Sequence, residues 1–272
     1  MDTFGWNARA RPLTDFTGDT AAGVNGLWTA TPPYKWLVPP PGSSGADSFT
    51  WDAHARSLTD FTGDTAGGTN GLWTATPPYH WQQNPPGSAV SYVSSPLRSD
   101  TTVVGSGAVR AWIRSSKPNV DLQVTLSEVR PDGKETFVQN GWLRTGDRRE
   151  FSCTDAVCSD VRLRKAAVEP LPRHRFVPVT IPLYYEGHAY RAGSQIRVVI
   201  SAPNGDQPIW SFARTRPKGK ARVAIASSKR IRSGLTLPVV PGVVVPTPLP
   251  PCPGLRGEPC RPYRPAAGAA TR

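Results

Sequence analysis

A serine nucleophile is the most specific chemistry that this sequence could carry, and one segment comes near its usual motif. The strained strand-to-helix turn of a nucleophile elbow needs G-x-S-x-G, because glycine on both sides of the serine lets the turn close. Residues 42–46 are Gly-Ser-Ser-Gly-Ala, so Ala46 stands where the last glycine belongs, and the segment lies in a Pro/Gly-rich stretch. We interpret it as a spacer and predict no catalytic residue in this chain.

The four histidines show no serine and aspartate at a spacing that indicates a catalytic triad. His54 and His80 align with basic residues in the other copy of a repeat described below, so we expect both to face solvent. His174 lies between two arginines, whose charge disfavours its protonated form. His188 follows a glycine and is expected in a turn. None of the four is assigned a catalytic role.

The cysteines do not have the spacing of a structural zinc site. Their spacings are C-x4-C and C-x7-C rather than the C-x2-C knuckle, so we predict no metal, and no nucleotide or cofactor motif occurs. Each pair can form a local disulfide, whereas a cytoplasmic chain would keep four free thiols. A Pro-rich segment without a core gains most from such a cross-link, which favours the second pair. The candidate pairs are Cys153 with Cys158 and Cys252 with Cys260.

A tandem repeat occupies the first third of the chain. Two nearly identical segments begin at Phe4 and Phe49. Two copies are too few for a solenoid, so we interpret them as a local duplication in which the first copy is redundant. Aromatic residues of the second copy, Trp73, Tyr79 and Trp81, are candidates for an interdomain or ligand-facing surface. The alternative is a hydrophobic clamp over a sheet.

The elements that would have to position any site are strands. Alternation of apolar and polar residues predicts strands at 109–113, 120–126, 177–183, 195–200 and 221–225. Two prolines on the polar phase of 177–183 indicate an edge strand. Tight turns are predicted at 130–134 and 191–194. Short strands separated by turns predict an all-β antiparallel sandwich, followed by a Pro-rich extended tail.

Charge is the one compositional hint of a partner. The chain has 32 Lys and Arg against 20 Asp and Glu, a formal net charge of +12, and the basic residues are densest from Arg214 to Arg232. Such a run can bind nucleic acid or an anionic surface, but no nucleic-acid-binding motif accompanies it. We interpret the run as a solvated strand and loop face and predict no nucleic-acid partner. No apolar run is long enough for a membrane span.

Two segments carry a resemblance to a known family. GSGAVRAWIRSSKPNVDLQVTLSEVRPDGKETFVQNGWLRTGDRR, residues 105–149, resembles the C-terminal domain of X-Pro dipeptidyl-peptidases and of the related CocE/NonD (cocaine esterase-like) hydrolases. IPLYYEGHAYRAGSQIRVVISAPNGDQPIW, residues 181–210, resembles the same domain, and the likeness extends over residues 49–238. The resemblance implies a galactose-binding-like jelly roll. We therefore divide the chain into an irregular orphan repeat copy (1–48), the jelly roll (49–236) and the tail (237–272).

In complete members of that family an α/β-hydrolase domain supplies the Ser-His-Asp triad, and none of those residues can be carried over to this chain. The resemblance therefore implies an accessory domain, inactive alone, from a truncated or split bacterial hydrolase of dipeptidyl-peptidase or esterase type. Its expected partner is an α/β-hydrolase catalytic domain. The alternative is a free-standing carbohydrate-binding module. The sequence shows no export signal, which predicts a cytoplasmic chain, although full-length relatives can be exported.

Overall fold

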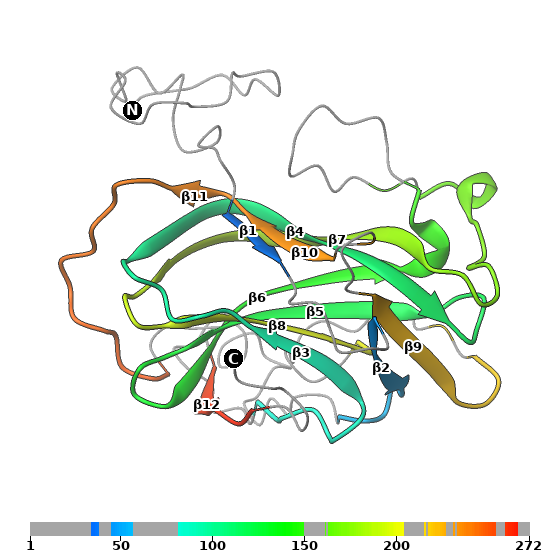
Figure 1. Ribbon diagram of the computed structural model, residues 1–272, viewed down its shortest axis with the longest axis horizontal. Helices are drawn as coiled ribbons and strands as arrows, with labels where there is room; N and C mark the ends of the chain where they lie inside the picture. Colours follow the sequence, from blue (N-terminus) through cyan, green and yellow to red (C-terminus); the bar gives the residue numbers. More distant parts are fainter. Residues whose placement is uncertain are drawn as a thin grey trace, which may run out of the picture.

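Antiparallel strands make up nearly all of the regular structure in the computed structural model (Figure 1). The structure describes residues 34–37, 45–56, 81–149, 161, 163–203, 215, 217–226, 231, 233–253 and 259–265. Within these ranges the helices are two single 3-10 turns, η3 (Thr145–Asp147) and η4 (Lys165–Ala167). Two sheets pack face to face, which confirms the predicted all-β sandwich.

The first sheet is organised around one long strand, β4. One edge of β4 pairs with β7 from Thr101 to Ile113, and β4 also pairs with β9, β10 and β11. β4 is the only strand that pairs with β7 among the described residues, so β7 is an edge strand, as the prolines in 177–183 predict. The strands of this sheet are β1 (Tyr34–Leu37), β2 (Ala46–Trp51), β4 (Thr101–Ser115), β7 (Val177–Tyr190), β9 (Ala221–Ala226), β10 (Gly234–Leu237) and β11 (Val239–Val240).

The second sheet has the strand order β12-β6-β5-β8-β3. All of its pairs are antiparallel. Its strands are β3 (Ala89–Val93), β5 (Asp121–Val129), β6 (Lys134–Arg144), β8 (Gln195–Ser201) and β12 (Cys260–Pro262). β12, at the lower left in Figure 1, pairs with the first residues of β6.

The core lies between the two sheets and follows the alternation seen in the sequence. On β5 the side chains of Leu122, Val124 and Leu126 are fully buried and belong to one hydrophobic cluster with residues of both sheets. Successive side chains on a strand point to opposite faces, so the intervening residues of β5 lie on the outer face. These outer residues are buried as well.

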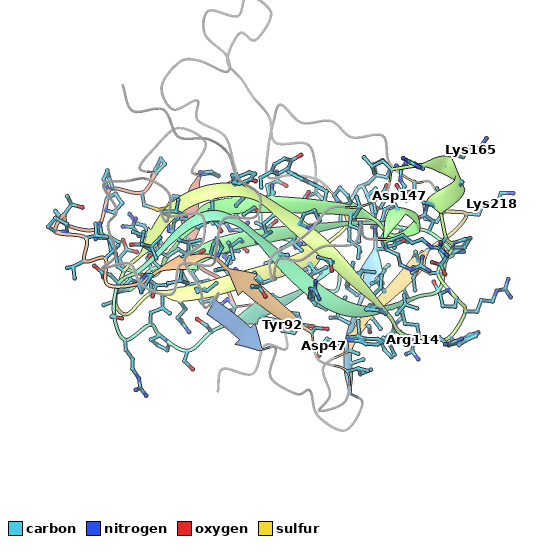
Figure 2. The ribbon with its side chains drawn as sticks, turned by 90° about the horizontal axis from the view of Figure 1, so that it is seen from above. Asp47, Tyr92, Arg114, Asp147, Lys165 and Lys218 are labelled. Atoms are coloured by element: carbon cyan, nitrogen blue, oxygen red, sulfur yellow. A yellow bond between two sulfur atoms is a disulfide. The ribbon has the colours of Figure 1, made fainter. Side chains whose placement is uncertain are left out.

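Contacts at opposite edges of the sandwich hold the sheets together. Where β6 meets β7, a Cβ atom at Gly141 would lie 1.9 Å from the carbonyl oxygen of Pro182, so no other residue fits at this approach. At the other edge the Tyr92 hydroxyl of β3 donates to Asp47 of β2 over 3.1 Å, a pair labelled in Figure 2. Burial, together with the charge of Asp47, raises the pKa of Tyr92 far above its ordinary value, so the phenol remains a donor.

Both predicted turns are present. In the 130–134 turn Gly133 has φ of 77°, and the backbone N–H of Arg130 donates to the carbonyl of Lys134 over 2.8 Å. In the 191–194 turn Gly193 has φ of 84°, and the N–H of Ser194 donates to the carbonyl of Arg191. Both glycines adopt the left-handed conformation that other residues disfavour, which is the reason the turn signals could be recognised from sequence.

The two flanking segments differ from their predicted irregular character. β1 comes from the orphan repeat copy and pairs with β10. β11 and β12 come from the predicted extended tail and pair with β4 and β6. Proline does not prevent this pairing, because β12 is an edge strand and Pro262 is its last residue, where a ladder N–H is not required. A disulfide between Cys252 and Cys260 connects β12 to the chain that precedes it.

In the part of the chain that the structure describes, no helix has the length and apolar character needed to cross a membrane.

Replacing both tail cysteines should detach β12 from the second sheet. We expect the Cys252→Ser/Cys260→Ser variant to lose about 2–3 kcal/mol of unfolding free energy, the loss expected for opening a loop of this size. Urea unfolding followed by tryptophan fluorescence measures the change. The matched control is the parent chain treated with a reductant, which should reproduce the loss. Equal stability of all three samples would contradict the assigned cross-link.

Candidate functional site

The outer face of the second sheet is polar but shielded from solvent. Gln123, Thr125 and Ser127 of β5 alternate with the core residues and are at most 3 % exposed. A sheet face in a two-layer sandwich is ordinarily solvated, so this face must be covered. Among the described residues, 81–87 and 259–265 contact it.

A buried carboxylate lies at the centre of this face. Glu135 of β6 is 0 % exposed and accepts hydrogen bonds from Arg197 of β8, Arg261 of β12 and Ser127 of β5. The Arg197 Nη1 and Arg261 Nε atoms each lie 2.8 Å from Oε2, and Arg261 Nη2 lies 3.1 Å from Oε1. We call these four residues the Glu135 network. A buried ion is tolerated only when its charge and its hydrogen bonds are both satisfied, and this network satisfies both.

Trp81 packs directly on the Glu135 network. The guanidinium carbon of Arg261 lies 3.5 Å from the centroid of the Trp81 ring, and Phe137 meets the same ring edge-on at 5.9 Å. The indole is 4 % exposed, so in this chain it covers the sheet, as in the hydrophobic-clamp interpretation. Its interdomain or ligand-facing role remains a prediction. Trp73 and Tyr79 lie outside the described residues, as do Cys153 and Cys158.

A second polar cluster lies inside the sandwich. His188 Nε2 is 2.9 Å from Glu128 Oε2, and the His188 ring packs edge-on against Tyr190 at 4.6 Å. Burial alone would raise the pKa of Glu128, but the hydrogen bond and charge of His188 hold it below its usual value. The turn expected at His188 is wrong. β7 continues to Tyr190 because β4 pairs with it residue by residue as far as Thr101.

The Glu186 side chain shares this interior with Glu128, His188 and Tyr190. Both carboxylate oxygens are buried and without a partner among the described residues. Burial raises the pKa of Glu186 to about 8, so the group is largely protonated at neutral pH. It lies opposite Gly105 of β4, on the same face of β7 as His188. The sequence gives no local signal for this cluster, because the alternation that places polar residues inward begins only after Leu183.

None of the other residues considered in the sequence was assigned a catalytic role, and the structure describes only some of them. His54 and His174 are exposed, and the Ser43-Ser44 pair and His80 lie outside the described residues. Within the described ranges no group of three His, Cys, Asp or Glu residues could hold a metal ion. The described part of the basic run includes β9, whose Arg222 donates to Ser48 of β2. Lys218 projects from the same end of the sandwich as Lys165 (Figure 2).

Removing the charge of Glu135 should destabilise the fold strongly. Glu135→Gln leaves two buried guanidinium groups without their counter-ion, so we expect a loss of about 3–5 kcal/mol in urea unfolding. The control is Glu169→Gln, which removes a half-exposed carboxylate paired with Arg148 and Arg149 and should cost at most about 1 kcal/mol. Similar losses in the two variants would mean that the network does not tie the covering segments to the sheet.

Replacing Glu186 should flatten the pH dependence of stability. Its pKa is about 8 in the folded chain against an ordinary value of 4.5, so over this range folding takes up a proton. Its contribution to the unfolding free energy therefore falls by about 1.4 kcal/mol for each pH unit as the pH rises. Near pH 4.5 we expect Glu186→Gln and the parent to have the same unfolding free energy. Near pH 8 we expect the variant to be the more stable of the two.

Urea unfolding across this pH range measures the effect, with Glu169→Gln as the control for the loss of one charge. A stability difference between parent and Glu186→Gln that stays constant with pH would contradict the assigned burial of the carboxyl group.

The chain matches one family model, described as the X-Pro dipeptidyl-peptidase C-terminal non-catalytic domain, over residues 15–224. No curated protein matches the chain. Among solved structures it is similar to a CocE/NonD family hydrolase from Staphylococcus aureus, with 17% identity and a TM-score of 0.53, covering 77% of this chain and 36% of that chain. It is also similar to an α-amino acid ester hydrolase, with 20% identity and a TM-score of 0.53, covering 76% of this chain and 36% of that chain.

At these identities the likeness to solved structures concerns the fold alone. The chain spans little more than a third of the length of those hydrolases. The family match, in contrast, extends over most of the sequence and includes β5, β6 and β8, which carry three of the four residues of the Glu135 network; Arg261 lies beyond the match. With its two-sheet sandwich and this match, the chain belongs to the family of X-Pro dipeptidyl-peptidase C-terminal non-catalytic domains.

Proposed function

We propose that the chain is an accessory domain of a CocE/NonD or X-Pro dipeptidyl-peptidase-like serine hydrolase and docks on an α/β-hydrolase catalytic domain. The observation that carries the proposal is the family match over residues 15–224, to a domain that is itself described as non-catalytic. The two polar clusters of the described residues support the proposal, because their buried carboxylates are enclosed by the protein and are not open to a substrate. Glu135 is saturated by its partners, and Glu186 is enclosed between the sheets.

An aromatic patch where β6 meets β7 is the docking surface we propose. Tyr184 and Tyr185 are 44 % and 62 % exposed, and Trp142 of β6 meets the Tyr184 ring at 5.4 Å. We call these three residues the edge patch. Tyrosine and tryptophan are enriched at protein interfaces, because they bury a large area and keep a polar tip for hydrogen bonding. The backbone beneath is fixed by the Gly141–Pro182 approach and by a hydrogen bond from Gln139 to the Tyr185 carbonyl.

Co-expression with the nearest upstream reading frame that encodes an α/β-hydrolase tests the proposal. We expect a complex of defined stoichiometry, measured by sedimentation, and an affinity at least about tenfold weaker for Tyr184→Ser/Tyr185→Ser. The control is Val244→Ser, which removes another exposed apolar side chain, 79 % exposed, outside the edge patch. Two folded proteins that do not associate would overturn the proposal. A complex that the double variant leaves unchanged would overturn the docking surface.

The chain alone should not turn over substrate. We expect no hydrolysis of generic esters or X-Pro substrates above the rate without protein, because the assigned role needs no triad. Turnover that co-purifies with the folded chain would contradict the accessory role.

A further inference from the structure

A cavity lined by arginines opens over the outer face of the second sheet. Its volume is about 250 Å³, and it lies between β3, β5 and β8 and the covering segments 83–87 and 261–265. Four guanidinium side chains line it, those of Arg56, Arg197, Arg261 and Arg264. No Asp or Glu is among the described residues of the lining. The cavity is therefore rich in cationic donors at a place where the sheet face is otherwise closed.

The arginine geometry is fixed before any ligand arrives. Arg197 is 4 % exposed and donates from Nε to Ser91 over 2.9 Å and from Nη1 to Glu135. Arg261 is 9 % exposed, stacks on Trp81 and donates to Glu135 and to the Gln82 carbonyl. Pre-ordered side chains lose little conformational freedom when they bind a ligand. These buried arginines would therefore bind an anion at a lower entropic cost than mobile arginines on the surface.

Donor groups in this cavity remain for a ligand. Among the described residues, Arg197 donates from Nε and Nη1, and its Nη2 hydrogens have no acceptor there. The Nδ2 atom of Asn84, another lining residue, is buried and has no hydrogen-bond partner among the described residues. A buried donor without an acceptor costs free energy, so an acceptor that enters the cavity would recover it. Arg264 is exposed at the rim and can approach the same ligand.

We propose that this cavity binds a small molecule through an oxyanion, a carboxylate or a phosphate group. Guanidinium forks match the planar edge of a carboxylate and two oxygens of a phosphate, and both groups supply acceptors alone. The volume is slightly below the range of ordinary ligand pockets, so the ligand is of metabolite size or smaller. The site is separate from the edge patch, and its test requires no catalytic domain, so either proposal can fail without the other.

Isothermal titration of the full chain with inorganic phosphate and with malonate, at constant ionic strength, tests the site. We expect one saturable site with a Kd of about 1 mM or tighter. Arg264→Gln/Asn84→Ala removes two ligand contacts outside the Glu135 network and should weaken binding at least about tenfold. Arg173→Gln, an exposed arginine away from the cavity, is the matched control and should leave the affinity unchanged.

Each outcome decides the proposal. Binding of phosphate alone or of malonate alone supports it and identifies the anion class, and binding of both supports the shared chemistry. No saturation by either anion up to about 10 mM would overturn it. An equal loss of affinity in Arg173→Gln would also overturn it, because it would indicate an adventitious ion only. Circular dichroism of the double variant verifies that the sandwich is intact.

Discussion

Glu135 carries a charge in a place that water does not reach, and the organisation of the second sheet follows from how that charge is satisfied. Its partners come from β5, β8 and β12, so one carboxylate ties together strands that are far apart in the sequence. Arg261 also holds Trp81 by stacking, which extends the tie to the end of the second repeat copy. The residues around Trp81 and β12 are therefore integral to this face of the domain.

The sequence predicted what depends on local pattern. Alternation located β5, β8 and β9, and glycine with proline or serine located the 130–134 and 191–194 turns, because strand periodicity and φ > 0 are properties of a few adjacent residues. Long-range partners were not predictable. Glu135 and Arg261 are 126 residues apart, and no local signal connects them. Long-range pairing also distinguishes the two repeat copies. Tyr34–Leu37 of the first copy forms β1, whereas residues 81–82, at the corresponding place in the second copy, lie in no strand. β10 supplies a pairing edge to the first copy.

The Glu135 network and the Glu186 cluster were the hardest features to predict from the sequence, because their polar residues do not form a recognisable catalytic motif. Arginines that looked like generic positive charge include Arg197 and Arg261, which are buried and paired with Glu135, whereas Arg173 and Arg264 are exposed. The burial of the Glu186 side chain follows from the direction in which β7 points its residues after Leu183. Among the described residues, buried charges thus pair with one another at Glu135, and arginines line a neighbouring cavity; both agree with membership of a non-catalytic family.

An accessory domain of the kind we propose would need no nucleophile of its own. The most direct measurement is the intact mass of the folded full-length chain after incubation with a fluorophosphonate, which labels activated serines wherever they lie in the sequence. We expect no added mass. One stoichiometric adduct on a serine, formed by the folded chain and absent after prior denaturation, would contradict it.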